Sequence, residues 1–424
     1  MRIAVLGSGG REHALAWRLG AETGDPVFVM PGNAGTPHTL EVRGTDPHTL
    51  AAVCLEHQVD LLVVGPEAPL AAGLADVLTA RGLRVFGPSA AAARLESSKA
   101  WAKDFMRRHG VATARYSVAH GVREAATLAG DGRVVLKYDG LAGGKGVVVC
   151  GSRADVDAGL SRLARAHGEE ARIVVEERLE GDEVSLVGIT DGHDMVLLPP
   201  CQDHKALLDG DLGPNTGGMG AFTPVPGCGP RVVDEAVRRV VAPTLAGLAA
   251  EGLPFRGALY FGLMITAEGP SLLEYNVRFG DPETEAVLPA LKGSLLDLVL
   301  AASDGELGRV APAGLSMAPD QGLTLVDVVL AAEGYPDRPR TGAPIEGLEI
   351  PDGGDCRVFH GGTRRDGAVV RVAGGRVLHV VASGPDVASA RMRAADRIRE
   401  IHFDGMHFRS DIGLRRWSSG PGAP

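Results

Sequence analysis

Four short apolar segments near the start of the chain each run into a turn rich in glycine or proline. They lie at residues 3–6, 27–30, 61–64 and 84–86. Helical apolar spacing follows the first of them, at Ala14, Leu15 and Leu19. Short apolar strands that alternate with helices are typical of an open, mostly parallel α/β sheet. The pattern therefore predicts a Rossmann-like domain at the N-terminus.

The turns after these strands predict a binding edge, because ligands of open α/β sheets lie beyond the carboxyl ends of the strands. Gly9 and Gly10 stand where a helix begins, and the free amides and dipole of a helix N-terminus favour an anion. Asn33 and Glu67 bring polar side chains to the turns after two further strands. We expect these four residues to bind substrate, with a phosphate at the glycine pair.

A dinucleotide site is a weaker interpretation of the same glycine turn. The G-x-G-x-x-G fingerprint requires glycine where the chain has Glu12, and no acidic residue follows residues 27–30 to hold a ribose. A nicotinamide-dependent oxidoreductase or sensor remains an alternative, and both departures count against it.

Length and composition narrow the class of protein. At 424 residues the chain is too long for one hydrophobic core, so several domains are expected. A net charge of −10 leaves no basic excess to neutralise nucleic-acid phosphates. The five cysteines are scattered without C-x-x-C spacing, and no apolar run is long enough to span a bilayer. We expect a cytoplasmic protein with no nucleic-acid or membrane partner.

Residues 272–285, which read LLEYNVRFGDPETE, carry the strongest metal-binding pattern. Alternate residues of an extended strand share a face, so Glu274, Asn276 and Arg278 are expected to point the same way. Carboxylate and amide oxygens are the hard ligands that Mg²⁺ prefers, and an arginine fork suits a carboxylate or phosphate. The alternative is an edge strand with a solvated polar face.

Two glycine-rich loops predict contacts with anions. Residues 139–146 join the strands predicted at 134–137 and 147–149 and carry Lys145, but they lack the residues of a P-loop. We expect this loop to fold over phosphates as a lid. Residues 213–220 form the densest polar and glycine-rich loop, and its backbone amides are expected to line an anionic substrate.

Two further segments have a structural and a functional interpretation. The strand predicted at 172–177 leads into an acidic turn that can hold an adenine edge and a ribose, or can be an ordinary acidic turn. His204 has no partner His or Cys at metal spacing, so we expect a hydrogen-bonded structural histidine.

The last quarter of the chain predicts an α+β part with no obvious chemistry of its own. Residues 303–321 are rich in glycine and proline and are interpreted as a linker, and residues 418–424 are expected to be disordered. The predicted elements are strands at 323–330, 369–372 and 376–382 and a helix over 387–401. The expected domains are 1–100, 101–310 with a small lobe at about 120–185, and 323–417.

Several motifs occur in one order along the chain: GSGGREHAL, PGNAGT, VGPEAPL, FGPSAAAARLESSKAWAKDF, DGLAGGKGVVV, QDHK, GPNTGGMGAFTP and RFGDPETE. Together they resemble the phosphoribosylamine–glycine ligases (glycinamide ribonucleotide synthetases), ATP-grasp ligases of purine synthesis. The resemblance extends from Met1 to about Arg416. It implies a Rossmann-like substrate domain, an ATP-grasp fold that binds ATP between a small and a central domain, and a C-terminal α+β domain.

The resemblance also implies which residues bind ATP and metal. The lysines that would face the phosphates are Lys103, Lys137 and Lys145. The residues that would hold adenine and ribose are Glu176, Glu177, Leu179 and Glu183. Glu274 and Asn276 would bind Mg²⁺ or Mn²⁺.

The implied substrates are glycine, 5-phosphoribosylamine and ATP, and a monomer is expected. Arg278 would approach glycine and its acyl phosphate, together with the loop residues Asn215, Thr216, Gly217, Gly218 and Met219. The catalytic residues are expected to be Arg278, Lys145 and Asp203, and Asp281 remains a second candidate for a general base.

Two positions depart from the family pattern. Tyr138 stands where an alanine commonly precedes the lysine loop, and Ala206 stands where a basic residue often follows QDHK. Neither departure touches the metal pair. Another ATP-grasp carboxylate ligase or carboxylase remains an alternative, which the amino acid that triggers ADP release would decide.

Overall fold

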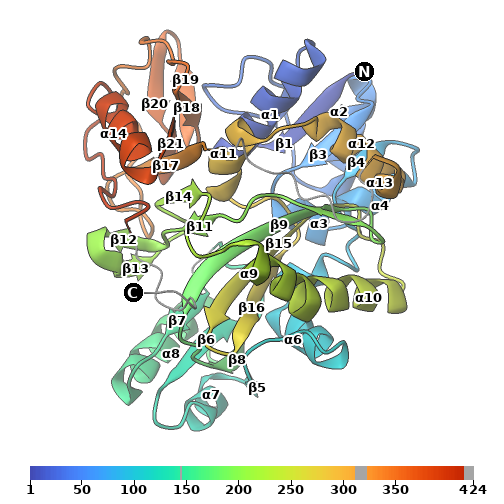
Figure 1. Ribbon diagram of the computed structural model, residues 1–424, viewed down its shortest axis with the longest axis vertical. Helices are drawn as coiled ribbons and strands as arrows, with labels where there is room; N and C mark the ends of the chain where they lie inside the picture. The colour runs from blue at the N-terminus through green and yellow to red at the C-terminus, as the bar shows by residue number, and fades with distance from the viewer. Residues whose placement is uncertain (144–145, 311–321, 415–424) are drawn as a thin grey trace.

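The structure is a computed structural model that describes residues 1–143, 146–310 and 322–414. Figure 1 shows an N-terminal part in blue and a C-terminal part in orange and red, side by side at one end of the molecule. A small lobe in teal lies at the other end, and a central sheet in green and yellow connects it with the first two parts.

The N-terminal part is the open parallel sheet that its strand pattern predicts. Its strands are hydrogen-bonded in the order β2-β1-β3-β4, and all three neighbouring pairs are parallel. The strands are β1 (Ile3–Gly7), β2 (Phe28–Pro31), β3 (Leu61–Val64) and β4 (Arg84–Phe86). The helices are α1 (Gly10–Thr23), α2 (Pro47–Glu56), α3 (Glu67–Ala71), α4 (Leu74–Thr79) and α5 (Arg94–Ser97).

Helix α1 begins where Glu12 caps the turn before it. Glu12 Oε2 accepts a hydrogen bond from the amide of Gly9 at 2.6 Å, which satisfies a donor that the helix leaves unpaired. The residue that breaks the dinucleotide fingerprint therefore has a structural task at this turn.

The small lobe is an antiparallel sheet with two helices and a core of its own. It follows helix α6 (Lys99–Arg108), whose N-cap is Ser98. The strand order is β5-β8-β6-β7. The elements are β5 (Tyr116–His120), α7 (Val122–Leu128), β6 (Val134–Tyr138), β7 (Val147–Val149), α8 (Arg153–His167) and β8 (Arg172–Glu177).

The central sheet is antiparallel, with the strand order β10-β9-β15-β16. Its strands are β9 (Asp182–Thr190), β10 (Met195–Leu197), β15 (Gly257–Thr266) and β16 (Gly269–Asn276). The helices before β15 are α9 (Pro230–Ala236), η2 (Val237–Val241) and α10 (Ala242–Ala250). The helices after β16 are α11 (Glu283–Val287), η3 (Leu288–Ala290), α12 (Leu295–Asp304) and α13 (Leu307–Val310).

The C-terminal sheet takes two strands from the middle of the chain. Its order is β11-β14-β17-β21-β18, in which β11 (Gln202–Asp203) and β14 (Gly220–Thr223) precede the central hairpin in sequence. The remaining strands of the sheet and its helix are β17 (Thr324–Ala331), β18 (Cys356–His360), β21 (Arg376–Gly384) and α14 (Val387–Ile398). Two hairpins complete this part: β12 (Ala206–Leu208) with β13 (Leu212–Asn215), and β19 (Thr363–Asp366) with β20 (Val369–Val372).

Two predictions about the backbone are wrong in part. The linker predicted at 303–321 begins as helix, because α12 continues to Asp304 and α13 follows it, while residues 311–321 lie outside the described residues. The loop predicted at 213–220 begins inside strand β13, which pairs with β12. The disorder predicted for 418–424 also falls outside the described residues.

One hydrophobic core is continuous through three of the four parts. It contains Val5 of β1, Val187 of β9, Val299 of α12 and Val381 of β21. The small lobe has a separate core that includes Leu136 and other residues of its own sheet and helices. The small lobe therefore packs as a unit of its own, since none of its described residues belongs to the core that the other three parts share.

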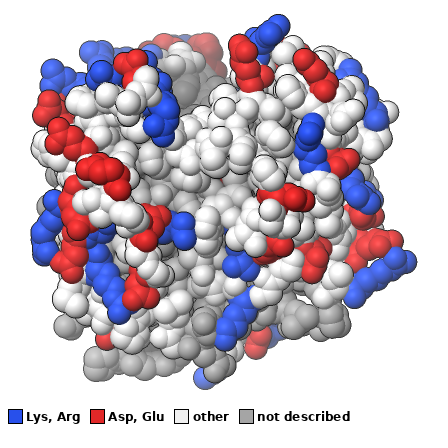
Figure 2. All heavy atoms as spheres, turned by 90° about the horizontal axis from the view of Figure 1, so that it is seen from above, with Lys and Arg blue, Asp and Glu red and all other residues white. Residues whose placement is uncertain are grey.

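The surface carries charges of both signs. On the face in Figure 2, Lys and Arg side chains are interspersed with Asp and Glu around the rim, and uncharged residues take the centre. None of the helices in the described ranges is both long enough and apolar enough to cross a membrane.

Gly10 is packed against residues from distant parts of the chain, and this leads to a prediction. A Cβ atom at Gly10 would lie 2.5 Å from His379 Cδ2 and 2.6 Å from Glu285 Oε1. We expect Gly10→Ala to destabilise the fold by roughly 1–3 kcal/mol through overpacking, measured as a lower Tm. The control is Gly20→Ala in the same helix, where the nearest atom to a Cβ is 3.8 Å away. An unchanged Tm for Gly10→Ala would contradict the packing role.

Candidate active site

A cavity of about 410 Å³ lies where the four parts of the molecule meet. Its basic side chains are Arg11, Lys99, Lys103, Lys137, Lys205, Arg278 and Arg376. Its carboxylates are Glu67, Glu96, Glu176, Asp203, Glu274, Asp281 and Glu283. Charges of both signs concentrated in one enclosure suit a strongly polar ligand such as a phosphate with its counter-ion.

Strand β16 brings the predicted metal residues to this cavity. Glu274 and Asn276 line it from the end of the strand, and Arg278 lines it just beyond the strand. Strand β16 is an edge strand, as the alternative interpretation has it, but its polar residues line the cavity instead of forming a solvated face. All three residues that the sequence predicted to share a face therefore line one cavity.

Glu274 is held in its ionised form. Burial alone raises the pKa of this carboxyl group, but Lys205, Lys137, Lys99 and Arg278 outweigh that effect and hold it below its usual value. Within the described part of the chain, neither the Glu274 carboxylate nor the Asn276 amide makes a side-chain hydrogen bond, so both are available to a ligand.

A second cavity of about 430 Å³ adjoins the first. The predicted nucleotide residues Glu176, Glu177, Leu179 and Glu183 all line it. Its apolar lining comes from Val135, Val147, Val149, Leu179, Met264 and Leu273. An apolar slot beside the end of strand β8 suits a planar base, and acidic side chains at its rim suit ribose hydroxyls.

The two cavities share a wall, which includes Lys137, Lys205, Thr216 and Glu274. A ligand in the second cavity can therefore extend past this wall into the first.

A buried network joins α6 to the small lobe. Lys103 Nζ lies 2.9 Å from Glu176 Oε2, and Lys137 Nζ lies 3.0 Å from Glu176 Oε1, with all three side chains at most 6% exposed. Lys137 also donates to the backbone oxygen of Leu273 at 2.8 Å. Burial lowers the pKa of Lys103 to about 8, although Glu176 opposes this shift. Sequence reasoning named both lysines and Glu176 as nucleotide-binding residues but did not predict that they pair with one another.

Arg278 is oriented by two carboxylates of the N-terminal part. Its Nε lies 3.3 Å from Glu67 Oε2, and its Nη2 lies 3.2 Å from Glu96 Oε1. Glu96 also accepts a hydrogen bond from the amide of Val277 at 2.7 Å. Burial raises the pKa of Glu96 to about 7 despite the nearby guanidinium. Sequence reasoning missed Glu96, although it lies inside one of the motifs that carry the family resemblance.

The loop from Asn215 to Met219 is built differently from the prediction. The amides of Thr216, Gly217, Gly218 and Met219 donate to Lys205 O, Tyr335 Oη, Thr216 Oγ1 and His204 O, respectively. The expectation that these amides line an anion is therefore wrong, because the protein itself satisfies them. Thr216 and Gly217 line the first cavity, Asn215 lines the second, and Met219 is fully buried.

The substrate residues predicted at the N-terminal turns separate into two groups. Glu67 lines the first cavity. Among the described residues that line it, Gly9, Gly10 and Asn33 do not occur. The side-chain Nδ2 of Asn33 donates hydrogen bonds to the backbone oxygens of Ser8 and His360 at 3.0 and 2.6 Å. Asn33 therefore connects the turn after β2 to the turns at Ser8 and His360.

Carboxylates also surround the glycine pair. Glu12 caps Gly9, Asp281 Oδ2 lies 3.5 Å from the Cβ position of Gly9, and Glu285 adjoins Gly10. Such neighbours oppose a second anion. A substrate role for Gly9, Gly10 and Asn33 stays a prediction, and packing is now a sufficient reason for glycine at position 10.

The two candidate bases differ in their electrostatics. Burial and Glu283 raise the pKa of Asp203, whereas Arg376, with Arg11 and Arg278, outweighs burial and lowers the pKa of Asp281 to about 2. His204 is the structural histidine that the sequence predicts, since its Nε2 accepts a hydrogen bond from the amide of Gly413 at 3.2 Å.

The C-terminal part contributes to the site, which corrects the expectation that it has no chemistry of its own. Arg376 of β21 lines the cavity, donates to the backbone oxygen of Gly217 at 2.8 Å and pairs with Asp281 at 3.0 Å. Other cavity residues that sequence reasoning left out of the site are Lys99, Lys205, Tyr260 and Glu283. Lys99 carried a signal in its four-residue spacing to Lys103, Lys205 in the QDHK motif and Glu283 in the RFGDPETE motif.

The two departures from the family pattern have structural outcomes. The Tyr138 ring stacks on His167 at 3.7 Å, and Cβ atoms at Gly140 or Gly146 would contact it, so the tyrosine packs under the glycine loop. Ala206 begins strand β12 opposite Asn215. Lys145, the predicted loop lysine, lies outside the described residues.

Two antiparallel sheets that enclose an apolar pocket opening onto a lysine- and carboxylate-lined cavity define an ATP-grasp enzyme. Solved structures agree: a phosphoribosylamine–glycine ligase from Thermotoga maritima matches with a TM-score of 0.81 and 35% identity, covering 97% of this chain and 100% of that one. A biotin carboxylase from Campylobacter jejuni matches with a TM-score of 0.71 at 16% identity, over 97% of this chain and 94% of its own, and shares the fold alone.

Sequence comparison identifies the family. The chain matches the phosphoribosylglycinamide synthetase N domain over residues 1–96, its ATP-grasp (A) domain over 97–284 and its C domain over 325–415. Phosphoribosylamine–glycine ligases from Ralstonia nicotianae and Streptomyces coelicolor are 44% and 46% identical, each over 98% of this chain and 99% of the relative. The chain belongs to the phosphoribosylglycinamide synthetase family and is an ATP-grasp ligase of purine biosynthesis.

The pKa of Lys103 predicts how nucleotide binding depends on pH. Lys103 is protonated below about pH 8 in the free protein and loses its charge above that value. ATP affinity should therefore fall as the pH rises from 7 to 9, by roughly tenfold if one charge contact is lost. Isothermal titration calorimetry across this range tests the effect. Lys103→Met should bind ATP weakly at every pH in the range, and an unchanged pH profile in this variant would contradict the assignment.

Proposed function

We propose that the protein joins glycine to 5-phosphoribosylamine and converts ATP to ADP and phosphate through a glycyl phosphate. The observation that carries this proposal is the wall shared by the two cavities, in which Lys137, Lys205 and Glu274 face both. A nucleotide whose base occupies the apolar cavity has its terminal phosphate directed at the charged one. The substrates in the name of the relatives described above, phosphoribosylamine and glycine, support this choice.

The nucleotide contacts are proposed from the lining of the second cavity. Glu176, Glu177 and Leu179 lie at the end of β8 and would hold adenine, and Glu183 of β9 would hold the ribose. Lys103 and Lys137 would neutralise phosphate oxygens. To do so, each lysine must either leave Glu176 or contact Glu176 and a phosphate oxygen at the same time. Lys145 is proposed for the same task from the sequence alone.

Glu274 and Asn276 fit a divalent cation. Their oxygens are hard donors that face the cavity, and the ionised state of Glu274 provides the charge that Mg²⁺ or Mn²⁺ requires. When bound, such an ion neutralises the phosphates of ATP and aligns the γ-phosphoryl group.

The remaining residues position and activate glycine. A carboxylate is a poor electrophile, and phosphorylation turns it into an acyl phosphate with a good leaving group. Arg278 is suited to hold the glycine carboxylate, because Glu67 and Glu96 fix its planar fork before the substrate arrives. The lysines of the wall that the two cavities share, Lys137 and Lys205, then stabilise the charge that develops during phosphoryl transfer.

The amine of 5-phosphoribosylamine attacks the glycyl phosphate in the closed cavity. The small lobe has its own core and can close over the site, which excludes the water that would hydrolyse this intermediate. Asp281 is a weak base because its pKa is low, and burial favours the protonated form of Asp203, which has no free carboxylate to accept a proton. We propose that the departing phosphate takes up the amine proton.

One experiment separates this function from that of a carboxylase with the same fold. ADP release should require ATP, Mg²⁺, glycine and freshly made phosphoribosylamine together, and mass spectrometry should find glycinamide ribonucleotide. Omission of any one component should abolish the product. ADP release triggered by bicarbonate in place of glycine would instead support a carboxylase.

The role of Glu274 is testable by a single substitution. Glu274→Gln should lower turnover by at least about a hundredfold with little change in Tm, because a ligand and its charge are lost rather than packing. The control is Glu268→Gln, an exposed carboxylate in the turn between β15 and β16, which should keep full activity. Near-normal turnover of Glu274→Gln at limiting Mg²⁺ would contradict the metal assignment.

A further inference from the structure

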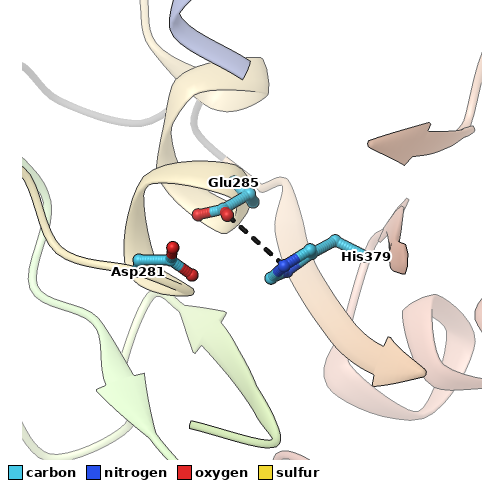
Figure 3. Close-up of side chains that lie close together, drawn as sticks. All are labelled: Asp281, Glu285 and His379. Carbon is cyan, nitrogen blue, oxygen red and sulfur yellow. Dashed lines mark ion pairs between the residues drawn. The ribbon is translucent and has the colours of Figure 1, made fainter. Parts of the chain in front are cut away.

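A second set of buried metal-ligand side chains lies beside the active cavity. Asp281, Glu285 and His379 each offer one ligand atom, and these atoms all lie within 4.8 Å of one another. Figure 3 shows the three side chains converging, with Asp281 and Glu285 from the turn and helix of α11 and His379 from the facing strand β21. The set therefore joins the central part to the C-terminal part.

Glu285 is wholly buried without a hydrogen bond. Its exposed fraction is 0%, and neither carboxylate oxygen has a hydrogen-bond partner within the described ranges. The nearest partner atom, His379 Nε2, is 3.6 Å from Glu285 Oε1, which is beyond hydrogen-bond distance. A buried carboxylate without hydrogen bonds is costly in its ionised form unless a cation compensates its charge. The Glu285 side chain points into the cluster (Figure 3).

His379 presents one ring nitrogen to the carboxylates. Its Nδ1 lies 2.9 Å from Asp327 Oδ2 on β17, which favours the proton on Nδ1 and turns the lone pair of Nε2 toward Glu285. Histidines that bind metals are commonly oriented by a carboxylate in this way.

Carboxyl groups outnumber the arginines that pair with them at this junction. The carboxylates that meet here are Asp281, Glu285 and Asp327. Arg376 pairs with Asp281 at 3.0 Å, while Arg11 and Arg278 pair with carboxylates of the N-terminal part. A set of converging carboxyl groups with one imidazole nitrogen suits one divalent cation.

Asp281 also provides a route of entry. It lines the 410 Å³ cavity, whereas Glu285 and His379 lie behind it and are at most 1% exposed. A cation in the cavity can reach the inner two ligands past Asp281.

We propose that Asp281, Glu285 and His379 bind a divalent cation distinct from the nucleotide metal, with Asp327 as the residue that orients the histidine. One imidazole nitrogen with two carboxylates suits Mn²⁺ or Zn²⁺ better than Mg²⁺. The cation fastens β21 to α11 behind Arg376. This inference stands apart from the proposed reaction, because it depends on neither ATP nor glycine.

The test is Mn²⁺ binding to chelator-treated protein without nucleotide. We expect one tightly bound Mn²⁺ whose electron spin-echo spectrum shows ¹⁴N coupling from an imidazole, a feature that Glu274 and Asn276 cannot produce. Zn²⁺ should displace it and raise the Tm. A wild-type protein that binds no Mn²⁺ or Zn²⁺ under these conditions, or a spectrum without ¹⁴N coupling, would overturn the proposal.

Matched variants separate the two metal sites. Glu285→Gln and His379→Gln should each weaken Mn²⁺ binding at least tenfold and remove the ¹⁴N coupling, while Glu274→Gln should retain both. Loss of binding in Glu274→Gln with retention in Glu285→Gln would assign the ion to the nucleotide site instead. If a variant unfolds, the wild-type spectrum still decides, because it needs no substitution.

Discussion

Pairing of buried opposite charges across separate parts of the chain holds this site together. Glu176 at the end of β8 lies between Lys103 of α6 and Lys137 of β6, and Arg278 lies between Glu67 and Glu96. A buried charge is tolerated only when a partner and hydrogen bonds compensate it. Each pair therefore fixes how the elements approach one another. The same charges remain at the cavity wall, where a phosphate ligand can exchange places with the protein partner.

The distribution of hydrophobic cores determines what can move around these charges. The N-terminal, central and C-terminal parts share one core, so they present the cavity as a single body. The small lobe is packed on its own and touches the site through Lys137, the end of β8 and the described residues of the glycine-rich loop after β6. Such a division suits an enzyme that must admit ATP and then exclude water from a reactive acyl phosphate.

The C-terminal part is more than a support. Strands β11 and β14 join its sheet, and Arg376 reaches from β21 to Asp281 and Gly217. Behind Arg376, the carboxylates and His379 form a junction at which the central and C-terminal parts meet. The electrostatics of the substrate cavity and the docking of the C-terminal part therefore depend on one another, because they use the same arginine and the same aspartate.

Local patterns in the sequence determined much of this protein. The strand and turn spacing predicted the parallel N-terminal sheet, alternation along β16 predicted that Glu274, Asn276 and Arg278 face one cavity, and ordered motifs predicted the ATP-grasp ligase family. These features depend on neighbours in sequence, which is why they could be predicted from it. Only the tertiary structure decided the rest. The amides of residues 216–219 donate hydrogen bonds within the protein. Gly10 packs against Glu285 and His379, and Glu96 and Arg376 line the site. These contacts join residues far apart in the chain, and no local periodicity records which distant side chain will fill a given space or compensate a given charge.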